Sequence, residues 1–176
     1  MLKKIVARAM YMGLVTGYKY PAFRPIYQKS NDILVSMIYK TYLKHGEAGW
    51  DKFWIPTMEE FGRIRAPYIA REMSIDVNVP SSIGLFHDFE DPIFGVEGHW
   101  EKTDDGVDVR VETSCKVCDH LNKITQGKSC PAFCHRIMTA MENGTGQALN
   151  EKYYIKVHSL LTEGSDACRV SHHFRE

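Results

Sequence analysis

The sequence lacks an excess of charge of either sign. Its 176 residues include 22 lysines and arginines and 22 aspartates and glutamates, so the formal net charge at neutral pH is zero. A balanced chain produces no strong electrostatic field to attract polyanions or anionic lipids. We therefore expect neither nucleic acid nor a membrane surface among its partners.

The sequence also lacks a long hydrophobic run, an internal repeat and a low-complexity tract. No apolar stretch approaches the length of a membrane-spanning helix. Residues 1–6 begin like a secretion signal, but Arg8 interrupts the apolar stretch and no small-residue cleavage site follows. These absences predict a soluble, cytoplasmic protein of ordinary globular composition.

Residues 1–75 have the apolar spacing of helices, with side chains of this kind recurring every three or four positions. We expect three helices, over residues 2–15, 32–44 and 57–72. Thr57 is placed to cap the third helix, and Pro67 inside it predicts a kink or a break. Two prolines among aromatic residues predict a connecting loop over residues 18–29.

Residues 76–176 form the second region, and alternating apolar residues appear there, beginning at residues 75–79. The turn sequence Asp104-Asp105-Gly106 predicts an antiparallel hairpin over residues 93–114. A second hairpin is expected over residues 153–174. We expect both hairpins to lie in one sheet.

Between the hairpins, Ser129 is placed to cap a helix that opens at Cys130-Pro131 and stops at Gly144. Helices, a hairpin, a helix and a hairpin in this order predict an α+β fold, with N-terminal helices packed against an antiparallel sheet. The whole chain has the size of one domain. The acidic segment 87–92 lacks the ligand spacing of a calcium-binding loop, and we predict a solvated turn there.

Five cysteines are the most distinctive chemical feature of the second region. Cys115 and Cys118 form a C-x-x-C after a strand, while Cys130 and Cys134 lie four residues apart on one helix face. Such spacings suit a metal ion that takes soft or borderline ligands, zinc or iron. The candidate metal ligands are Cys115, Cys118, Cys130, Cys134 and Cys168.

A second interpretation gives the same thiols a catalytic role. A cysteine near a helix N-terminus has its thiolate favoured by the helix dipole, which predicts that Cys134 is reactive, with Cys130 as its partner. Cysteines also serve as small apolar core residues, and this alternative stays open. We further expect Cys115, Cys134 and Cys168 to converge in space.

From Cys115 onward the sequence resembles two related families. Its ending, Gly164-Ser165-Asp166-Ala167-Cys168-Arg169, is similar to the last turn of 4-vinyl-reductase-type domains, which are small-molecule-binding α+β units. Ser114-Cys115, the segment 130–134 and the pattern Leu-x-x-Gly-x-x-x-Cys over residues 161–168 resemble the L-2-amino-thiazoline-4-carboxylic acid hydrolase family. The resemblance implies a 4-vinyl-reductase-like fold for the C-terminal half.

The second resemblance implies a hydrolase that opens a small sulfur- and nitrogen-containing ring or a cyclic amidine. Either Cys134 or Cys115 would act as a thiolate nucleophile, or a metal bound by cysteine and histidine would activate water. Proton transfer falls to His120 or His135. The substrate carboxylate would be held by Arg136 or Arg169.

Two alternatives belong to other functional classes. A 4-vinyl-reductase-like domain without catalysis would be a sensor that binds a small molecule or a metal. A scaffold protein would use the N-terminal helices as the surface of a homodimer, and a large exposed apolar face on those helices would favour it.

Overall fold

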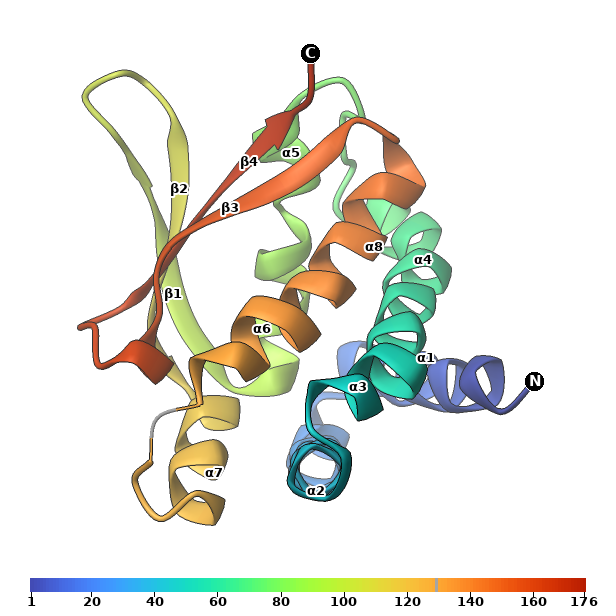
Figure 1. Cartoon of the computed structure of the whole chain (residues 1–176). Helices are drawn as coiled ribbons and strands as arrows, with labels where there is room; N and C mark the ends of the chain where they lie inside the picture. The colour runs from blue at the N-terminus through green and yellow to red at the C-terminus, as the bar shows by residue number, and fades with distance from the viewer. Residues whose placement is uncertain (129) are drawn as a thin grey trace.

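The computed structural model of the protein describes residues 1–128 and 130–176 and has an α+β fold (Figure 1). Four antiparallel strands form one sheet in the order β1-β2-β4-β3. Their bounds are β1 Val96–Lys102, β2 Asp108–Cys115, β3 Tyr153–Ser159 and β4 Cys168–Phe174. The predicted combination of helices with an antiparallel sheet is confirmed.

The helices lie together beside the sheet, with α6 and α8 against the strands and α4 behind α8 (Figure 1). The longer helices are α1 Leu2–Lys19, α2 Arg24–His45, α4 Ile55–Glu72, α6 Phe86–Phe94, α7 Lys116–Ile124 and α8 Thr139–Leu149. Short helical segments are η1 Pro21–Phe23, α3 Glu47–Gly49, η2 Trp50–Trp54, α5 Pro80–Ile83, η3 Phe133–Met138 and η4 Leu161–Glu163. Within residues 1–128 and 130–176, no helix is long and apolar enough to cross a membrane.

Both predicted hairpins form, and they share one sheet. Gly106 in the first turn has φ 81° and Gly164 before β4 has φ 85°, a left-handed conformation that glycine adopts without strain. The hairpins join through β2 and β4, where Val109 lies opposite Ser171. The first hairpin starts later than expected, because residues 93–95 complete α6 and its left-handed C-cap.

The loop predicted over residues 18–29 is wrong. α1 continues to Lys19 and α2 already begins at Arg24, so only Tyr20 and the short η1 separate the two helices. Pro25 lies in the first turn of α2, where its missing N–H removes no intrahelical hydrogen bond. Here the proline starts a helix instead of preventing one.

The start of α4 also differs from expectation. Thr57 is not an N-cap, because its hydroxyl donates to the Phe53 carbonyl, 2.6 Å away, inside a helix that continues from the π-helical η2. α4 continues through Pro67 to Glu72, so the proline does not break the helix. The alternating residues 75–79 form turns that lead into α5, so the pattern there does not make a strand.

The predicted helix after Pro131 is confirmed, but it is longer and less regular than expected. Its first part, η3, is π-helical, and it continues as α8 past Gly144 to Leu149. Gly144 does not end the helix. A Cβ on this residue would lie 2.5 Å from the Glu59 carbonyl oxygen of α4, so glycine permits close contact between the two backbones. The predicted cap, Ser129, lies outside the described residues.

One hydrophobic core joins the two regions of the chain. It includes side chains from α1, α2 and α4 together with side chains from α6, α7, η3 and β3. Its largest fully buried members are aromatic: Trp50, Phe61, Phe86, Phe89, Phe133 and Tyr153. A second, small cluster on the sheet contains Val109, Val111 and Ala167.

Candidate functional site

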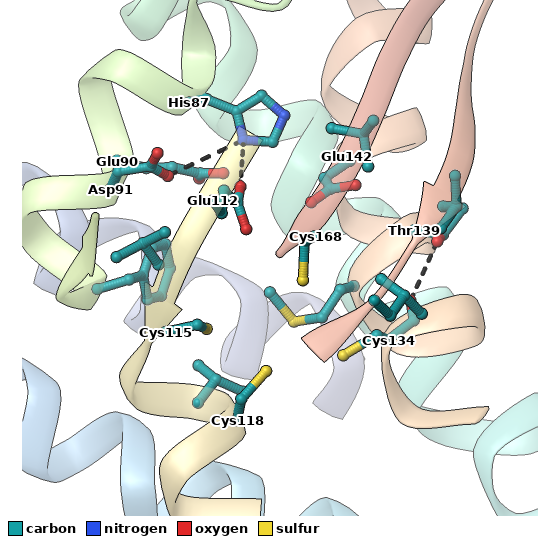
Figure 2. A pocket seen from close by; sticks show the side chains of 17 residues that line it. His87, Glu90, Asp91, Glu112, Cys115, Cys118, Cys134, Thr139, Glu142 and Cys168 are labelled. Atoms are coloured by element: carbon teal, nitrogen blue, oxygen red, sulfur yellow. Dashed lines mark hydrogen bonds and ion pairs between the residues drawn. The ribbon is translucent and has the colours of Figure 1, made fainter. Parts of the chain in front are cut away.

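A cavity of about 60 Å³ lies between the sheet and the helices that cover it (Figure 2). Its walls come from α6, β1, β2, α7, the helix formed by η3 and α8, β3 and β4. One end is lined by sulfur atoms and the other by carboxylates and an imidazole. The polar and sulfur-containing lining residues are His87, Glu90, Asp91, Glu112, Cys115, Cys118, Cys134, Met138, Thr139, Glu142 and Cys168.

Four cysteines meet at the sulfur end. Cys115 ends β2, Cys118 lies in the first turn of α7, Cys134 is on η3 and Cys168 begins β4. The Cys118 thiol lies among the other three, within hydrogen-bonding reach of each (Figure 2). The predicted convergence of Cys115, Cys134 and Cys168 is therefore confirmed. Strand and helix ends bring them together because β2 and β4 are paired neighbours.

The thiols differ in their tendency to ionise. The Cys118 thiol and the Leu161 backbone N–H, which donates over 3.3 Å, lower the pKa of Cys168 in spite of burial. Hydrogen bonds with Cys115, Cys134 and Cys168, together with burial, raise the pKa of Cys118. The arrangement therefore favours a Cys168 thiolate that accepts a hydrogen bond from a Cys118 thiol.

Cys130 stands apart from this cluster. It does not line the cavity, and burial raises the pKa of its thiol. Among the described residues no three cysteine sulfurs lie within 4.8 Å of one another. A tetrahedral zinc site has metal–sulfur bonds of about 2.3 Å, so a zinc or iron ion at the cluster requires the sulfurs to approach further.

The two histidines expected to transfer protons lie elsewhere. His120 on α7 shares a hydrogen bond of 2.8 Å with the Ser36 hydroxyl of α2. His135 on η3 pairs with Glu163, 2.8 Å away, on the exposed surface. Neither lines the cavity, because each lies on a side of its helix that faces another element or solvent.

The two arginines expected to hold a carboxylate are already paired on the surface. Arg136 makes ion pairs with Glu47, at 2.6 Å, and with Asp51. Arg169 pairs with Asp166 at 2.7 Å, next to it on the turn before β4. Neither guanidinium reaches the cavity, so the expected substrate clamp is not assembled from these residues.

The carboxylate end of the cavity was missed by the sequence analysis. His87, Glu90 and Asp91 are buried on α6, and the predicted solvated turn is wrong. His87 Nδ1 lies 3.2 Å from a Glu112 oxygen of β2 and 3.9 Å from an Asp91 oxygen (Figure 2). The signal was present in the apolar spacing of Phe86, Phe89 and Ile93, which is helical.

Two buried arginines neutralise part of this acidic wall. Arg65 of α4 pairs with Glu90 and donates from Nε to the Thr145 hydroxyl at 2.9 Å. Arg110 of β2 pairs with Asp91 at 2.5 Å and, through its other nitrogen, with the partly exposed Asp88. Each arginine lies 19 or more residues from the acid it neutralises, so these pairs exist only in the folded chain.

Burial and charge shift the pKa values of the acidic wall in different directions. Burial lowers the pKa of His87, but the hydrogen bonds that the ring donates to Asp91 and Glu112 outweigh it and raise the pKa well above 6.5. Burial raises the pKa of Glu142, on α8, to about 8, and it also raises that of Glu90. Burial lowers the pKa of His172 on β4 well below 6.5, and the nearby His87 adds to this effect.

A second hollow lies on the outside of the molecule, between α1 and α2. It has a volume of about 560 Å³ and is lined mainly by apolar side chains. Large hydrophobic residues on these helices are exposed to solvent, among them Ile5, Met12, Ile26, Ile33 and Met37. The apolar face that would favour a protein partner is therefore present.

Comparison with known proteins finds a structure with a similar fold but no matching family. No family model matches the chain, and no curated protein matches it. A solved structure that it resembles is the trafficking protein particle complex subunit 3 from Naegleria fowleri, covalently bound to palmitic acid. The TM-score is 0.57 at 12% sequence identity, over 86% of this chain and 97% of that chain. The two proteins share an α+β fold.

Proposed function

We propose that the protein is a hydrolase that opens a small sulfur- or nitrogen-containing ring, such as a 2-aminothiazoline-4-carboxylate, with Cys168 as its nucleophile. The observation that carries the proposal is the cysteine cluster on a cavity, in which Cys118 and the Leu161 N–H both favour a thiolate at Cys168. Thiolates with a lowered pKa are the reactive cysteines of enzymes. Cavities lined by groups of shifted pKa are candidate active sites.

The size of the cavity sets the substrate class. About 60 Å³ is several times the roughly 10–15 Å³ that one water molecule requires. A small heterocycle suits this space better than a long acyl chain or a peptide. Because neither Arg136 nor Arg169 reaches the cavity, the proposal does not depend on a carboxylate clamp from these residues.

In the proposed reaction, the Cys168 thiolate attacks the amidine carbon of the ring and forms a carbon–sulfur bond. The ring bond from that carbon to sulfur or nitrogen breaks, and the leaving atom takes a proton from the Cys118 thiol. Water then attacks the same carbon, releases Cys168 as a thiolate and returns a proton to Cys118. The cycle consumes one water and needs no oxidant or reductant.

The test is turnover of 2-aminothiazoline-4-carboxylate and simpler cyclic amidines, followed by the appearance of ring-opened product. We expect Cys168→Ser to abolish turnover and Cys130→Ser, outside the cavity, to leave it unchanged. Cys134→Ser separates the present assignment from the helix-dipole prediction. If Cys134→Ser removes turnover and Cys168→Ser retains it, Cys134 is the nucleophile.

A second candidate is a small-molecule-binding module without catalysis, a sensor of the 4-vinyl-reductase type. The observation in its favour is that the structurally similar trafficking protein particle complex subunit has a palmitic acid attached covalently. Intact-protein mass spectrometry with the same compounds decides between them. A stable adduct on a cavity cysteine without product release supports the module, whereas a transient adduct with product supports the hydrolase.

The exposed face of α1 and α2 supports a proposal about partners. We propose a homodimer through this face, because apolar residues there remain uncovered in the single chain. The similar protein is a subunit of a multi-protein complex, so another chain in place of a second copy is the competing outcome. Sedimentation of the purified chain distinguishes a dimer from a monomer.

A further inference from the structure

The acidic wall of the cavity contains a compact set of metal-binding side chains. His87, Asp91 and Glu112 each offer one ligand atom, and these three atoms lie within 4.8 Å of one another. Two of the residues come from consecutive turns of α6 and the third from β2. All three side chains are largely withdrawn from solvent.

The separations match the edges of a coordination shell. Metal bonds of about 2.0–2.2 Å to nitrogen or carboxylate oxygen place neighbouring ligand atoms roughly 3.0–3.5 Å apart. His87 Nδ1 and the Glu112 oxygen are 3.2 Å apart, and His87 Nδ1 and the Asp91 oxygen are 3.9 Å apart. Side-chain movements that shorten the longer separations bring all three to one ion, because no two of the ligand atoms are more than 4.8 Å apart.

A second, independent observation is a carboxyl group in the cavity that has no partner. Arg65 pairs with Glu90, Arg110 pairs with Asp91, and His87 pairs with Glu112. Glu142 points into the cavity from α8 and makes no hydrogen bond or ion pair within residues 1–128 and 130–176 (Figure 2). Buried carboxylates are normally paired or bound to a metal.

We infer that His87, Asp91 and Glu112 bind a divalent transition-metal ion, with Glu142 facing the ion across the cavity. One imidazole and several carboxylates suit Mn²⁺, Fe²⁺ or Zn²⁺, whereas Ca²⁺ and Mg²⁺ take oxygen ligands. Arg110 holds the second oxygen of Asp91 and so orients the first toward the site.

This site lies at the opposite end of the same cavity from the cysteine cluster, and the inference does not depend on the thiol chemistry proposed above. The same arrangement without a metal is a protonated His87 held between two carboxylates. A metal ion whose absorption spectrum depends on its ligands distinguishes the metal-bound site from the metal-free one. Co²⁺ bound by thiolates shows an intense sulfur-to-metal charge-transfer absorption, and Co²⁺ bound by nitrogen and oxygen does not.

The experiment titrates Co²⁺, and in parallel Mn²⁺, into the chelator-treated full chain. We expect one equivalent of Co²⁺ to bind without the charge-transfer absorption and to raise the melting temperature. Glu112→Gln, Glu142→Gln and His87→Gln should each weaken binding at least about 10-fold. The matched control is the exposed pair His99 and Glu101 on β1, 2.9 Å apart, where His99→Gln and Glu101→Gln leave binding unchanged.

Two outcomes overturn the inference. One is a wild-type affinity no better than that of Glu112→Gln. The other is a charge-transfer absorption that Cys118→Ser removes, which assigns the ion to the cysteines. Because Glu142 makes no ion pair in the described part of the chain, Glu142→Gln should fold even where His87→Gln does not. Normal Co²⁺ binding by Cys168→Ser, with turnover lost, separates this site from the proposed hydrolase.

Discussion

Two regions of this molecule reverse the usual distribution of polar and apolar side chains. The wall of the cavity buries ionisable groups, and Glu90 there is 3% exposed. The outer face of α1 and α2 exposes large hydrophobic groups, and Ile26 there is 63% exposed. Folding opposes both arrangements, because buried charge loses its hydration and exposed hydrocarbon stays in water.

The difference lies in how each region offsets that cost. The cavity wall is compensated mostly within the chain, since Arg65 and Arg110 come from separate elements to pair with its acids. The outer face has no such compensation from residues 1–128 and 130–176, which leave its large apolar side chains exposed. Compensation inside the chain is typical of a site that exists in the isolated protein, and the proposed homodimer would cover the outer face that lacks it.

The largest effect on stability is expected when a buried arginine that neutralises the cavity wall is removed. Arg65→Met leaves Glu90 buried without its cation, and we expect a loss of about 3–5 kcal/mol in the free energy of unfolding. Denaturant titration measures it. Adding Glu90→Gln to the same chain should restore most of the loss.

The matched control is Arg63, whose ion pair with Glu60 is on the surface and whose side chain is 59% exposed. Arg63→Met should change stability by no more than about 1 kcal/mol. Equal losses for the Arg63 and Arg65 substitutions would mean that the Arg65–Glu90 pair is no more important than a surface one.

A smaller effect is expected in the pH dependence of stability, to which the buried histidine beside the cavity wall contributes. His172 is buried with a pKa well below 6.5, so the unfolded chain binds its proton first and stability falls as the pH drops below 6.5. His87, Tyr153, His173 and Arg110 face this ring. In chelated protein, His172→Gln should reduce the loss between pH 6.5 and 5.5 by about 1 kcal/mol.

The substitution control for that measurement is His99→Gln, which changes a histidine whose side chain is 54% exposed. His87 contributes with the opposite sign. Its raised pKa adds stability at low pH that is lost as the pH rises through the folded value. An unchanged acid transition in His172→Gln would show that the ring is protonated in the folded chain.

The smallest effect on stability is expected at the outer face. Ile26→Glu and Ile33→Glu should change the free energy of unfolding of the monomer by less than about 0.5 kcal/mol, because both side chains are already in water. The same substitutions should shift the sedimenting species from dimer to monomer. A dimer that survives both changes does not use this face.

The sequence predicts the strands and the sulfur cluster better than it predicts the acidic wall. Alternating valines and Asp104-Asp105-Gly106 are local signals, and local signals suffice for a hairpin. The cysteines converge because β2 and β4 are neighbours in the sheet, which the two hairpins already imply. The prediction for segment 87–92 was wrong because its acidic residues are typical of a solvent-exposed turn. Only the fold shows that Arg65 and Arg110 pair with them.

The π-helical turn of η3 has a consequence for how the protein can vary. A π-helical segment contains an extra residue compared with an α-helix of the same register, and each residue of an α-helix turns the chain by about 100°. Deleting one of residues 135–138 would restore regular helix and rotate Cys134 away from the cavity while α8 stayed in place. In relatives that lack this extra residue, a different side chain should therefore occupy the place of Cys134 in the cavity. This should hold even where a cysteine aligns with Cys134 in sequence.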